Sequence, residues 1–323
     1  MKKILIFVDE LSENPSKDEE DTLIEANEVK KALVSLGYEP IIRPFSLNLL
    51  KNIEIMEEEK WALIFNLVET LSSNTMIHIA PLLFENYNKK YSGGNSQAMF
   101  ITSDKVFAKK TFKSAKIRCA DYYYIKSKNV SSTLINKDVI IKPINDEASC
   151  GINDSSIMNF KSADELKKYI AKNPTLFVEE FINGREYNVS VMKIDGCVKV
   201  LPIAQMQFID FPKDKPKILN YKSKWEEESF EYKNTCRTFA CGEDDKELMI
   251  ELNEISKKCY SLFGSKGYMR VDFRVDEFGT PFVLEVNVNP CISKDSGFVA
   301  AAKEYKMNYE QLIQNIVEGS LNE

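Results

Sequence analysis

The stretches GYMRVDFRV (Gly267–Val275) and LEVNVNP (Leu284–Pro290) decide the fold of this chain. Apolar and polar residues alternate in both, so neighbouring side chains point to opposite faces of an extended strand. The residues Asp276–Gly279 between them form a turn signal. The two stretches therefore predict an antiparallel hairpin with one apolar and one polar face.

Four polar side chains of this hairpin can meet on one face. Arg270 and Asp272 share a face of the first strand, and Glu285 and Asn287 share a face of the second. If the register brings these faces together, two carboxylates and an amide converge beside an arginine. Such a set suits Mg²⁺, a hard ion that takes oxygen ligands and keeps phosphates and waters as its other ligands. The alternative is a solvated sheet face, but acids and amides followed by the Asn289-Pro290 turn favour the metal site.

A lysine and a small-residue loop follow the apolar strand Val139–Pro143. Lys142 stands at the end of this strand, and Ser149 and Gly151 belong to the loop. This arrangement can place an ammonium group and backbone N–H groups around phosphate oxygens. The loop lacks the GxxxxGK[ST] pattern, so a lysine that reaches from a strand end into water remains the alternative.

The segment FVEEFINGRE (Phe177–Glu186) is a strand that ends in acids and a turn. The backbone after Glu179 could serve an adenine, and the carboxylate of Glu186 could serve ribose hydroxyls. By itself this pattern is also that of an ordinary exposed strand end.

The first hundred residues alternate strands and helices, which predicts a parallel α/β sheet. The expected elements are a strand at Lys3–Val8, a helix at Asp21–Leu36, and strands at Pro40–Pro44 and Trp61–Leu67. Ligands of such sheets lie beyond the carboxyl ends of the strands, so Asp9, Glu10 and Glu69 are expected to face a crevice.

The rest of the chain predicts two further units. A helix Asp104–Ala115, capped by Ser103, opens the second unit, and a capping box at Ser162–Glu165 starts its next helix. From Tyr187 onward the strands are expected to be mostly antiparallel, with Asp195-Gly196 as a hairpin turn. The predicted boundaries are 1–101, 102–186 and 187–323. The remaining elements are expected at Leu176–Ile182, Lys246–Phe263 and, as helices, within Val299–Gly319.

Composition excludes several classes of protein. The formal net charge of −6 argues against a nucleic-acid partner, which needs clustered cations. No apolar run approaches the ~20 residues of a membrane helix. Seven cysteines, odd in number and without a CxxC pair, predict reduced thiols and a cytoplasmic protein. His78 is the single histidine, which excludes a histidine-based metal site, and its surroundings predict a helix packed on the core.

The order and spacing of these motifs resemble the D-alanine–D-alanine ligase-like branch of the ATP-grasp superfamily over nearly the whole chain. The matching residues are Asp104-Lys105 ("DK"), Lys142-Pro143 with Ser149 and Gly151 ("KP…SxG"), Glu179–Glu186 ("E…G.E"), Tyr221–Trp225 (a mobile lid) and the hairpin ("G..R.D…E.N..P"). The resemblance implies an ATP-grasp fold, α/β overall and α+β in the C-terminal half, with an N-terminal parallel α/β domain.

The resemblance also implies roles for particular residues. ATP would be held by Lys105, Lys142, Ser149, Glu179, Glu180, Phe181, Ile182, Glu186 and the lid residue Lys224. Asp272, Glu285 and Asn287 would hold Mg²⁺ or Mn²⁺. Arg270 would stabilise the oxyanion of acyl transfer and act with Lys142 and Ser149 as the catalytic set. Ser296 would contact a substrate carboxylate, and Glu69, Asn289 and Cys291 would line the substrate pocket.

The chain departs from the family pattern in three places. The segment Asp9–Asn14 replaces the N-terminal glycine-rich loop and the "EREVS" segment, and Glu69-Thr70 replaces the "HG" after the third strand. Cys291 stands where the D-alanine ligases have a glycine. With no histidine nearby to lower its pKa, Cys291 is expected to be a packing residue and not a nucleophile. The ATP and metal residues are therefore expected to match the family, and the amino-acid pockets to differ.

The expected function is ATP- and Mg²⁺-dependent ligation of a carboxylate, that of an amino acid, to an amine through an acyl phosphate, which gives an amide or dipeptide and ADP. The partners are small-molecule carboxylate and amine substrates, with no nucleic acid and no membrane, and a homodimer is left open. Two alternatives remain: an ATP-binding regulatory protein without turnover, and an ATP-grasp kinase that passes phosphate to a hydroxyl group.

Overall fold

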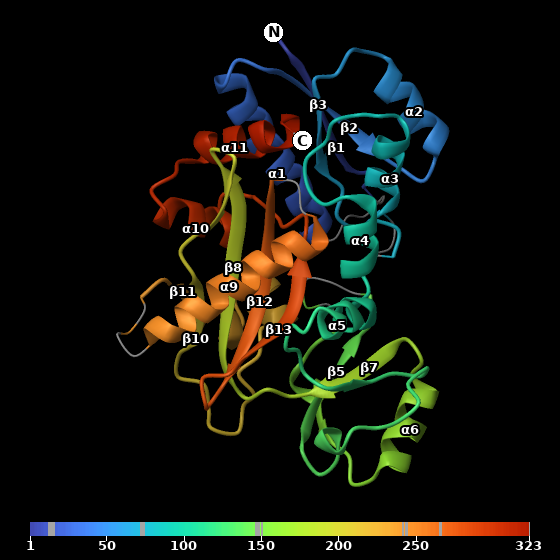
Figure 1. Cartoon of the computed structure of the whole chain (residues 1–323), viewed down its shortest axis with the longest axis vertical. Coiled ribbons are helices and arrows are strands. Elements are labelled where there is room, and N and C mark those ends of the chain that lie inside the picture. The colour runs from blue at the N-terminus through green and yellow to red at the C-terminus, as the bar shows by residue number, and fades with distance from the viewer. Residues whose placement is uncertain are drawn as a thin grey trace.

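Three sheets stacked along the long axis form the protein (Figure 1). The structure is a computed structural model and describes residues 1–11, 17–71, 75–145, 149, 151–240, 242, 245–264 and 267–322, without the side chains of 17–19. The N-terminal sheet lies at one end of the molecule, the sheet of the middle segment at the other, and the C-terminal sheet between them.

The N-terminal sheet is parallel, as predicted. Its order is β2-β1-β3, with β1 at Lys3–Asp9, β2 at Glu39–Phe45 and β3 at Leu63–Leu67. The central strand β1 is buried from Ile4 to Asp9, as its continuous apolar run requires.

The two faces of β1 pack against different helices. Leu5 and Phe7 contribute to the core beneath α2 (Leu49–Glu57) and α3 (Ile79–Asn86). There, the rings of Phe7, Phe45 and Phe84 lie with their centroids 5.2 to 5.9 Å apart.

The opposite face of the N-terminal sheet is covered by helices from both ends of the chain. Ile4, Ile6 and Val8 share a core with α1 (Lys17–Ser35) and with the C-terminal helices α10 (Gly297–Glu304) and α11 (Tyr309–Leu321). Figure 1 shows α11 beside α1 at this end of the molecule. The last residues of the chain therefore complete the core of the first domain.

The first predicted boundary falls in a helix. Residues 101 and 102 belong to α4 (Ser96–Thr102), which ends at Ser103. The next helix, α5 (Lys105–Ser114), is capped by Asp104, whose carboxylate accepts the Phe107 N–H at 2.8 Å. The prediction that Ser103 caps this helix was therefore wrong by one residue. His78 precedes α3 and packs edge-on against Phe100, with ring centroids 5.1 Å apart.

The middle segment forms an antiparallel sheet in the order β4-β7-β5-β6. Its elements are β4 (Tyr122–Tyr123), β5 (Asp138–Pro143), β6 (Ile157–Asn159), β7 (Leu176–Glu180), α6 (Ala163–Lys172) and the 3₁₀ turns η1 (Ser132–Leu134) and η2 (Asp154–Ser156). Ser162 caps α6 by accepting the Glu165 N–H, as predicted, but the Glu165 carboxylate accepts the N–H of Lys161 and not that of Ser162.

The C-terminal sheet is antiparallel in the order β11-β10-β8-β12-β13, and β9 also pairs with β8. Its elements are β8 (Gly184–Ile194), β9 (Cys197–Val200), β10 (Ala204–Phe208), α7 (Tyr221–Trp225), α8 (Phe230–Lys233), β11 (Thr235–Thr238), α9 (Lys246–Phe263), β12 (Tyr268–Asp276) and β13 (Pro281–Asn287). The predicted hairpin turn is confirmed, because Asp195 and Gly196 have φ angles of 50° and 76°. Helix α9 covers the apolar face of this sheet, which leaves the polar face for the site (Figure 1).

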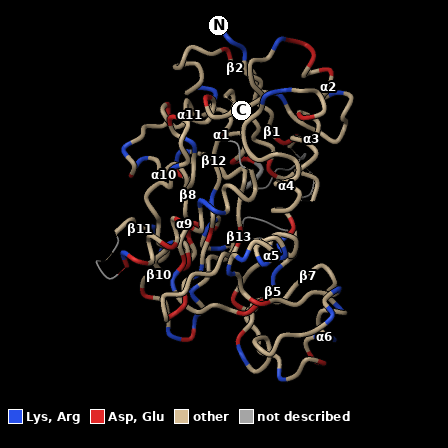
Figure 2. Tube along the Cα trace, in the orientation of Figure 1, with Lys and Arg blue, Asp and Glu red and all other residues tan. Residues whose placement is uncertain are grey.

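Charges of both signs are interleaved along the chain (Figure 2). Within the described residues, no helix combines the length and the apolar character needed to cross a bilayer.

Candidate active site

The polar face of the C-terminal sheet brings the predicted metal residues together. Strand β12 places Arg270 opposite Asn287 and Asp272 opposite Glu285 of β13. On its other side, Asp272 lies opposite Asn188 of β8. The alternation of residues was compatible with this register but did not require it, and the structure confirms it. A β-bulge ends the regular pairing just after the Asp272–Glu285 pair.

Arg270 and Asp272 form a close ion pair on this face. Nε of Arg270 donates to both oxygens of Asp272 at 2.8 and 3.2 Å, and Nη2 donates to Oδ2 at 2.9 Å. Asn188 donates to Oδ1 of the same carboxylate at 2.8 Å. Burial alone would lower the pKa of Arg270, but the Asp272 carboxylate raises it above its usual value, so Arg270 is a permanent cation.

Glu285 lies in the field of four cations. Burial alone would raise its pKa, but the charges of Lys105, Lys224, Arg270 and Lys142 outweigh burial and lower it. These lysines come from α5, from α7 and from the end of β5. The fold therefore gathers the predicted phosphate-binding lysines around one ionised carboxylate.

Glu179 is held inside the protein by two lysines. Its carboxylate contacts Nζ of Lys109 at 2.5 Å and Nζ of Lys142 at 2.5 Å, and both carboxylate and Lys109 are almost fully buried. Burial alone would raise the pKa of Glu179, but the two lysines lower it to about 2. Glu179 thus positions Lys142. Lys109 was not selected from the sequence, because lysines that alternate with apolar residues, as in α5, are typical of a solvated helix face.

Two backbone N–H groups in the segment that ends β7 and follows it already donate hydrogen bonds within the protein. The Glu180 N–H donates to the Asp121 carbonyl at 2.9 Å, and the Phe181 N–H donates to the Asp138 carbonyl at 3.1 Å. Of the predicted adenine contacts, Ile182 is therefore the residue best placed to offer a backbone N–H. The adenine contact itself stays a prediction.

Glu186 pairs with Arg274, a residue that the sequence reasoning did not select. Nε of Arg274 lies 3.3 Å from Oε2 of Glu186, and its Nη1 donates to the Gly184 carbonyl at 3.0 Å. The guanidinium also donates to the Lys217 carbonyl and lies over the Phe181 ring. Burial is the main cause that raises the pKa of Glu186. Arg274 follows the same alternation as Arg270 and Asp272, and this signal could have identified it.

Ser149 connects the phosphate loop to the segment before the predicted lid. It adopts a φ of 63°, and its hydroxyl donates to the Leu219 carbonyl at 2.8 Å. Gly151 has a φ of 72°, and a Cβ there would lie 3.1 Å from Cγ of Pro143. Positions 146–148 and 150 of this loop lie outside the described residues.

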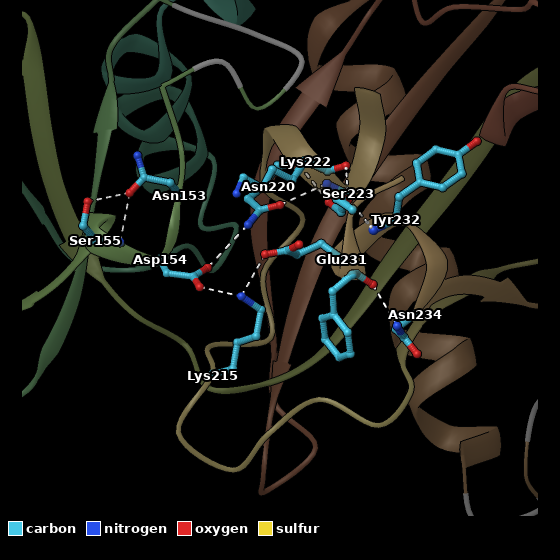
Figure 3. A network of polar contacts seen from close by, with 12 residues as sticks. Asn153, Asp154, Ser155, Lys215, Asn220, Lys222, Ser223, Glu231, Tyr232 and Asn234 are labelled. Carbon is cyan, nitrogen blue, oxygen red and sulfur yellow. Dashed lines mark hydrogen bonds and ion pairs between the residues drawn. The ribbon is translucent and has the colours of Figure 1, made fainter. Parts of the chain in front are cut away.

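The predicted lid is a short helix anchored by a polar network (Figure 3). Asn220 caps α7 by accepting the Ser223 N–H at 3.0 Å. Lys215 reaches between Asp154 of the middle segment, at 2.5 Å, and Glu231 of α8, at 2.8 Å. The network therefore ties the lid to the end of the phosphate loop.

The α10 N-terminus carries a cation that the sequence reasoning missed. Ser296 caps α10, with its hydroxyl accepting the Val299 N–H at 3.3 Å. The Arg237 guanidinium covers Gly297, where a Cβ would lie 3.2 Å from Nη2. Burial and the charge of Arg270 lower the pKa of Arg237, and its buried Nε has no hydrogen-bond partner in the described part of the chain. No local pattern in β11 singled out this arginine.

Asp9 organises the loop after β3. Its carboxylate accepts the N–H groups of Glu69 at 2.8 Å, Thr70 at 3.1 Å and Leu71 at 2.6 Å. The side chain is buried, so the prediction that Asp9 faces a crevice was wrong. Glu10 pairs with Lys51 of α2 at 3.2 Å instead. Of the three acids, Glu69 is the one that lies close to another predicted site residue, Cys291.

Glu69 and Cys291, both predicted to line the substrate pocket, come together with Glu25 of α1. One ligand atom from each of the three lies within 4.8 Å of the other two. Burial, followed by the charges of Glu25 and Glu69, raises the pKa of Cys291 well above its usual value. The cysteine is therefore a neutral thiol, which supports the prediction that it is not a nucleophile.

Asn289 supports the strand end beneath this pocket. Its Oδ1 accepts the Tyr268 hydroxyl at 3.0 Å. Its buried Nδ2 has no hydrogen-bond partner among the described residues. The side-chain NH₂ group of Asn289 is therefore available to a ligand.

Known proteins resemble this chain in sequence and in fold. The family described as "D-ala D-ala ligase C-terminus" matches residues 111–318. A D-alanine–D-alanine ligase of Aquifex aeolicus is 30% identical over 241 residues, 73% of this chain and 75% of that protein. An uncharacterized protein of Sinorhizobium fredii is 25% identical over 300 residues, 91% of this chain and 86% of its own length. The crystal structure of D-alanine–D-alanine ligase from Bacillus anthracis complexed with ATP superimposes with a TM-score of 0.73 at 21% identity, covering 100% of this chain and 98% of that one.

Proposed function

The chain belongs to the D-alanine–D-alanine ligase family of ATP-grasp enzymes, and from this premise we propose that its polar sheet face joins two amino-acid substrates at the expense of ATP. The enzyme is an ATP-dependent, ADP-forming carboxylate–amine ligase. The observation that carries the residue assignment is the facing pair Asp272 and Glu285 beside Arg270, with the three lysines of the site acting on Glu285.

The donor set of this face fits ATP with Mg²⁺. Asp272, Glu285 and Asn287 offer hard oxygen atoms, and an ionised Glu285 suits a divalent cation. When bound, the metal would neutralise phosphate charge and orient the terminal phosphate. Lys105 and Lys142 would hold the phosphate oxygens.

The nucleoside would occupy the hinge between the middle and C-terminal sheets. Ile182 would offer backbone groups to adenine, together with Glu180 and Phe181, and Glu186 would accept ribose hydroxyls. The pairing of Glu186 with Arg274 supports this role, because the arginine fixes the Glu186 carboxylate and leaves some of its hydrogen-bond acceptor positions available.

The chemistry would proceed in two steps. A carboxylate oxygen of the first substrate attacks the terminal phosphorus of ATP, and ADP leaves. The free amine of the second substrate then attacks the carbonyl carbon of the acyl phosphate, inorganic phosphate leaves, and the amine loses its proton. Arg270 would stabilise the negative charge that develops on the carbonyl oxygen, since its guanidinium is fixed before the reaction by Asp272.

The substrate end would use the α10 N-terminus. Ser296 and the α10 N–H groups, together with Arg237, would bind a carboxylate of the amine substrate. Arg237 and Arg270 carry like charges close together, and an anion between them would relieve their repulsion. Glu69, Asn289 and Cys291 would line the neighbouring pocket.

The relative from Aquifex aeolicus is a D-alanine–D-alanine ligase, and we propose amino acids as substrates here with a dipeptide as the product. The departures at Glu69 and Cys291 lie in the pocket and not at the nucleotide residues, so the second amino acid need not be alanine. The three domains with the boundaries 1–101, 102–186 and 187–323 stay a prediction, as does a cytoplasmic location, which the five free thiols among the described residues support; a homodimer stays open.

The test is ADP release with pools of D- and L-amino acids, with mass spectrometry for the condensed product. Glu285→Gln should reduce turnover by roughly 100-fold or more and weaken Mg-ATP binding, because the substitution removes a charged ligand and keeps its shape. Glu277→Gln, in the exposed turn between β12 and β13, is the matched control and should leave turnover unchanged.

Three outcomes would contradict the proposal. Full activity of Glu285→Gln would remove Glu285 from the metal site. ATP binding without turnover on any pool would favour the regulatory alternative, and a phosphorylated product that resists hydroxylamine would favour the kinase.

A further inference from the structure

Arg274 is a buried cation at the end of the polar sheet face where the nucleoside would lie. Its side chain is on the same face of β12 as that of Asp272, and the residue as a whole is only 4% exposed. The register places it opposite Glu186 of β8. A buried guanidinium is costly unless acceptors meet its donors, so its partners are the groups that it holds in place.

The guanidinium of Arg274 meets three acceptors. Nε lies 3.3 Å from Oε2 of Glu186, and Nη1 donates to the Gly184 carbonyl at 3.0 Å. Nη2 donates to the Lys217 carbonyl, in the segment between β10 and α7. The guanidinium carbon lies 5.7 Å from the centroid of the Phe181 ring. One side chain therefore joins the hinge, the carboxylate expected to bind ribose and the segment that leads to the lid.

The hinge side of this arrangement is held against the C-terminal sheet. Gly184 pairs with Asp276 of β12. A Cβ at Gly184 would come within 2.0 Å of the Val275 carbonyl oxygen, so only glycine fits there without moving a strand of the sheet. The contact between Arg274 and the Gly184 carbonyl is therefore a fixed point of the site.

The segment from Lys217 to the lid is held at both ends. Its Lys217 carbonyl accepts from Arg274, and its Leu219 carbonyl accepts the Ser149 hydroxyl of the phosphate loop at 2.8 Å. Asn220 follows directly and caps α7, the lid helix. The sugar end and the phosphate end of the nucleotide site therefore both contact the segment on which the lid is mounted.

The lid depends on this segment for its position. Ile218 is 4% exposed and Asn220 3%, whereas α7 has no buried residue of its own. A helix with so few packing contacts follows the segment that precedes it. Burial raises the pKa of Glu186, and the charges of Arg274 and of Lys224 in the lid oppose that effect. Arg274 and the lid lysine thus act on the same carboxylate.

We propose that Arg274 is a positioning residue that couples recognition of the ribose to closure of the lid. This inference rests on the ligase function proposed above, in which Glu186 accepts the ribose hydroxyls. A hydroxyl that binds Glu186 fixes the carboxylate, the carboxylate fixes the guanidinium, and the guanidinium fixes the Lys217 carbonyl ahead of the lid. A nucleotide that lacks the hydroxyl binds more weakly and leaves the lid less firmly closed.

An arginine that only stabilised the fold would behave differently. Its loss would weaken the binding of every nucleotide by the same factor, whatever the sugar. It would also have no selective effect on the lid. The preference between two nucleotides that differ in one sugar hydroxyl therefore separates the two roles.

The test compares ATP with 2′-deoxy-ATP, each with Mg²⁺ and the full chain. Calorimetry should show about tenfold or tighter binding of ATP, because the deoxy nucleotide lacks a hydrogen bond to a charged acceptor. With either nucleotide at saturation, backbone hydrogen exchange in residues 212–231 should be about threefold or more slower with ATP, because the lid is held more firmly. Neither measurement requires turnover.

Two substitutions of Arg274 separate its contacts. Arg274→Met should remove both differences between the nucleotides, and its effect on the binding preference should not add to that of Glu186→Gln, since the two residues act together. Arg274→Lys keeps a cation for Glu186 and so protects the fold. The ammonium lacks the planar fork that meets a carboxylate and two carbonyls at once. This variant should keep a preference for ATP in binding and lose the difference in exchange.

Arg185→Met is the matched control. Arg185 precedes Glu186 on β8, so its side chain points to the opposite face of the sheet, where it pairs with Asp245 at 2.7 Å. The variant should keep both the preference for ATP and the slower exchange with ATP.

The inference is overturned by equal exchange with the two nucleotides in the unchanged protein, or by differences that persist in Arg274→Met. Loss of both differences in Arg185→Met would overturn it as well, because any disturbance of this strand end would then have the same effect. Dipeptide formation with any of these results would leave the ligase function intact. Coupling that is observed without turnover on any amino-acid pool would support the role of Arg274 and contradict the ligase function.

Discussion

Buried charged residues hold this site together. Lys109 and Glu179 are both almost fully buried, and together with Lys142 they form a chain of three charges. A buried pair contributes little compared with a well-packed apolar pair, but removing one partner leaves an uncompensated charge. Breaking this chain of charges should therefore lower both the stability of the protein and its affinity for ATP.

Lys109→Met should lower the free energy of unfolding by about 3 to 5 kcal/mol, because Glu179 loses one of its two cations. Lys142 alone would then neutralise Glu179 and would be less available to the phosphates, so the affinity for ATP should fall as well. Urea unfolding and nucleotide binding measure the two effects. Lys113→Met, on the same helix in an exposed pair with Asp121, should change neither by a comparable amount. Equal effects of the two substitutions would contradict the role of burial.

Glu25 should make the stability of the protein depend on pH. Its pKa is raised from 4.5 to about 8, first by burial. The folded state therefore keeps a proton that the unfolded state has lost, and the stabilisation falls as the pH rises from about 4.5 to about 8. At ~1.4 kcal/mol for each pKa unit, the total loss is on the order of a few kcal/mol.

Urea unfolding at pH 5.5 and pH 8.5 measures this loss. Glu25→Gln should abolish the part of the slope that Glu25 causes, since the amide does not titrate. Glu28→Gln, on the same helix, is the control and should keep the slope of the unchanged protein. An unaltered slope in Glu25→Gln would mean that other groups cause the pH dependence.

At the scale of elements, the lid is the part most easily moved. Helix α7 has no buried residue, and α8 buries only Glu231. Few buried contacts mean low local stability, which a segment that opens and closes needs. Lys215 offsets this low stability, because it pairs with Asp154 of the middle segment and with Glu231 of α8 and so joins the two parts.

Lys215→Met should loosen the lid without removing a group that touches the substrates. Water would then reach the acyl phosphate more often, so ADP release should exceed dipeptide formation, whereas the two are equal in the unchanged enzyme. The ratio of ADP to dipeptide is the measurement. Lys233→Met, in an exposed pair with Glu228 of the same segment, is the control and should keep the ratio near one. An unchanged ratio in Lys215→Met would show that the network does not govern closure.

At the scale of the whole molecule, the nucleotide would lie where the middle sheet meets the C-terminal sheet. The first domain is fixed to the C-terminal helices by a shared apolar core, whereas the middle sheet has a separate core of its own. Motion should therefore occur between the middle segment and the rest of the molecule.

A non-hydrolysable ATP analogue with Mg²⁺ should slow backbone hydrogen exchange in residues 151–156 and 212–231, because both sides of the Lys215 network would be held together. Hydrogen exchange followed by mass spectrometry resolves these segments. Strand β1 is the internal reference and should not change. Protection spread evenly over the chain, or absent from these segments, would contradict closure between the two parts.

Local patterns in the chain predicted most elements and much of the polar sheet face. The parallel first sheet, the hairpin at Asp195-Gly196, the helix Lys246–Phe263 and the hairpin with Arg270 and Glu285 were all predicted. These features follow from period-two and helical patterns and from turn residues, which act between neighbours in the chain.

The partners of each polar side chain, in contrast, depend on how distant segments pack together. Glu25 lies beside Glu69 and Cys291, Arg237 lies near Arg270, and the last helices complete the core of the first sheet. No local pattern contains these pairings, since they join segments up to several hundred residues apart. They arise because apolar faces must be covered, and that packing brings together charges that then require a proton, a counter-ion or a substrate.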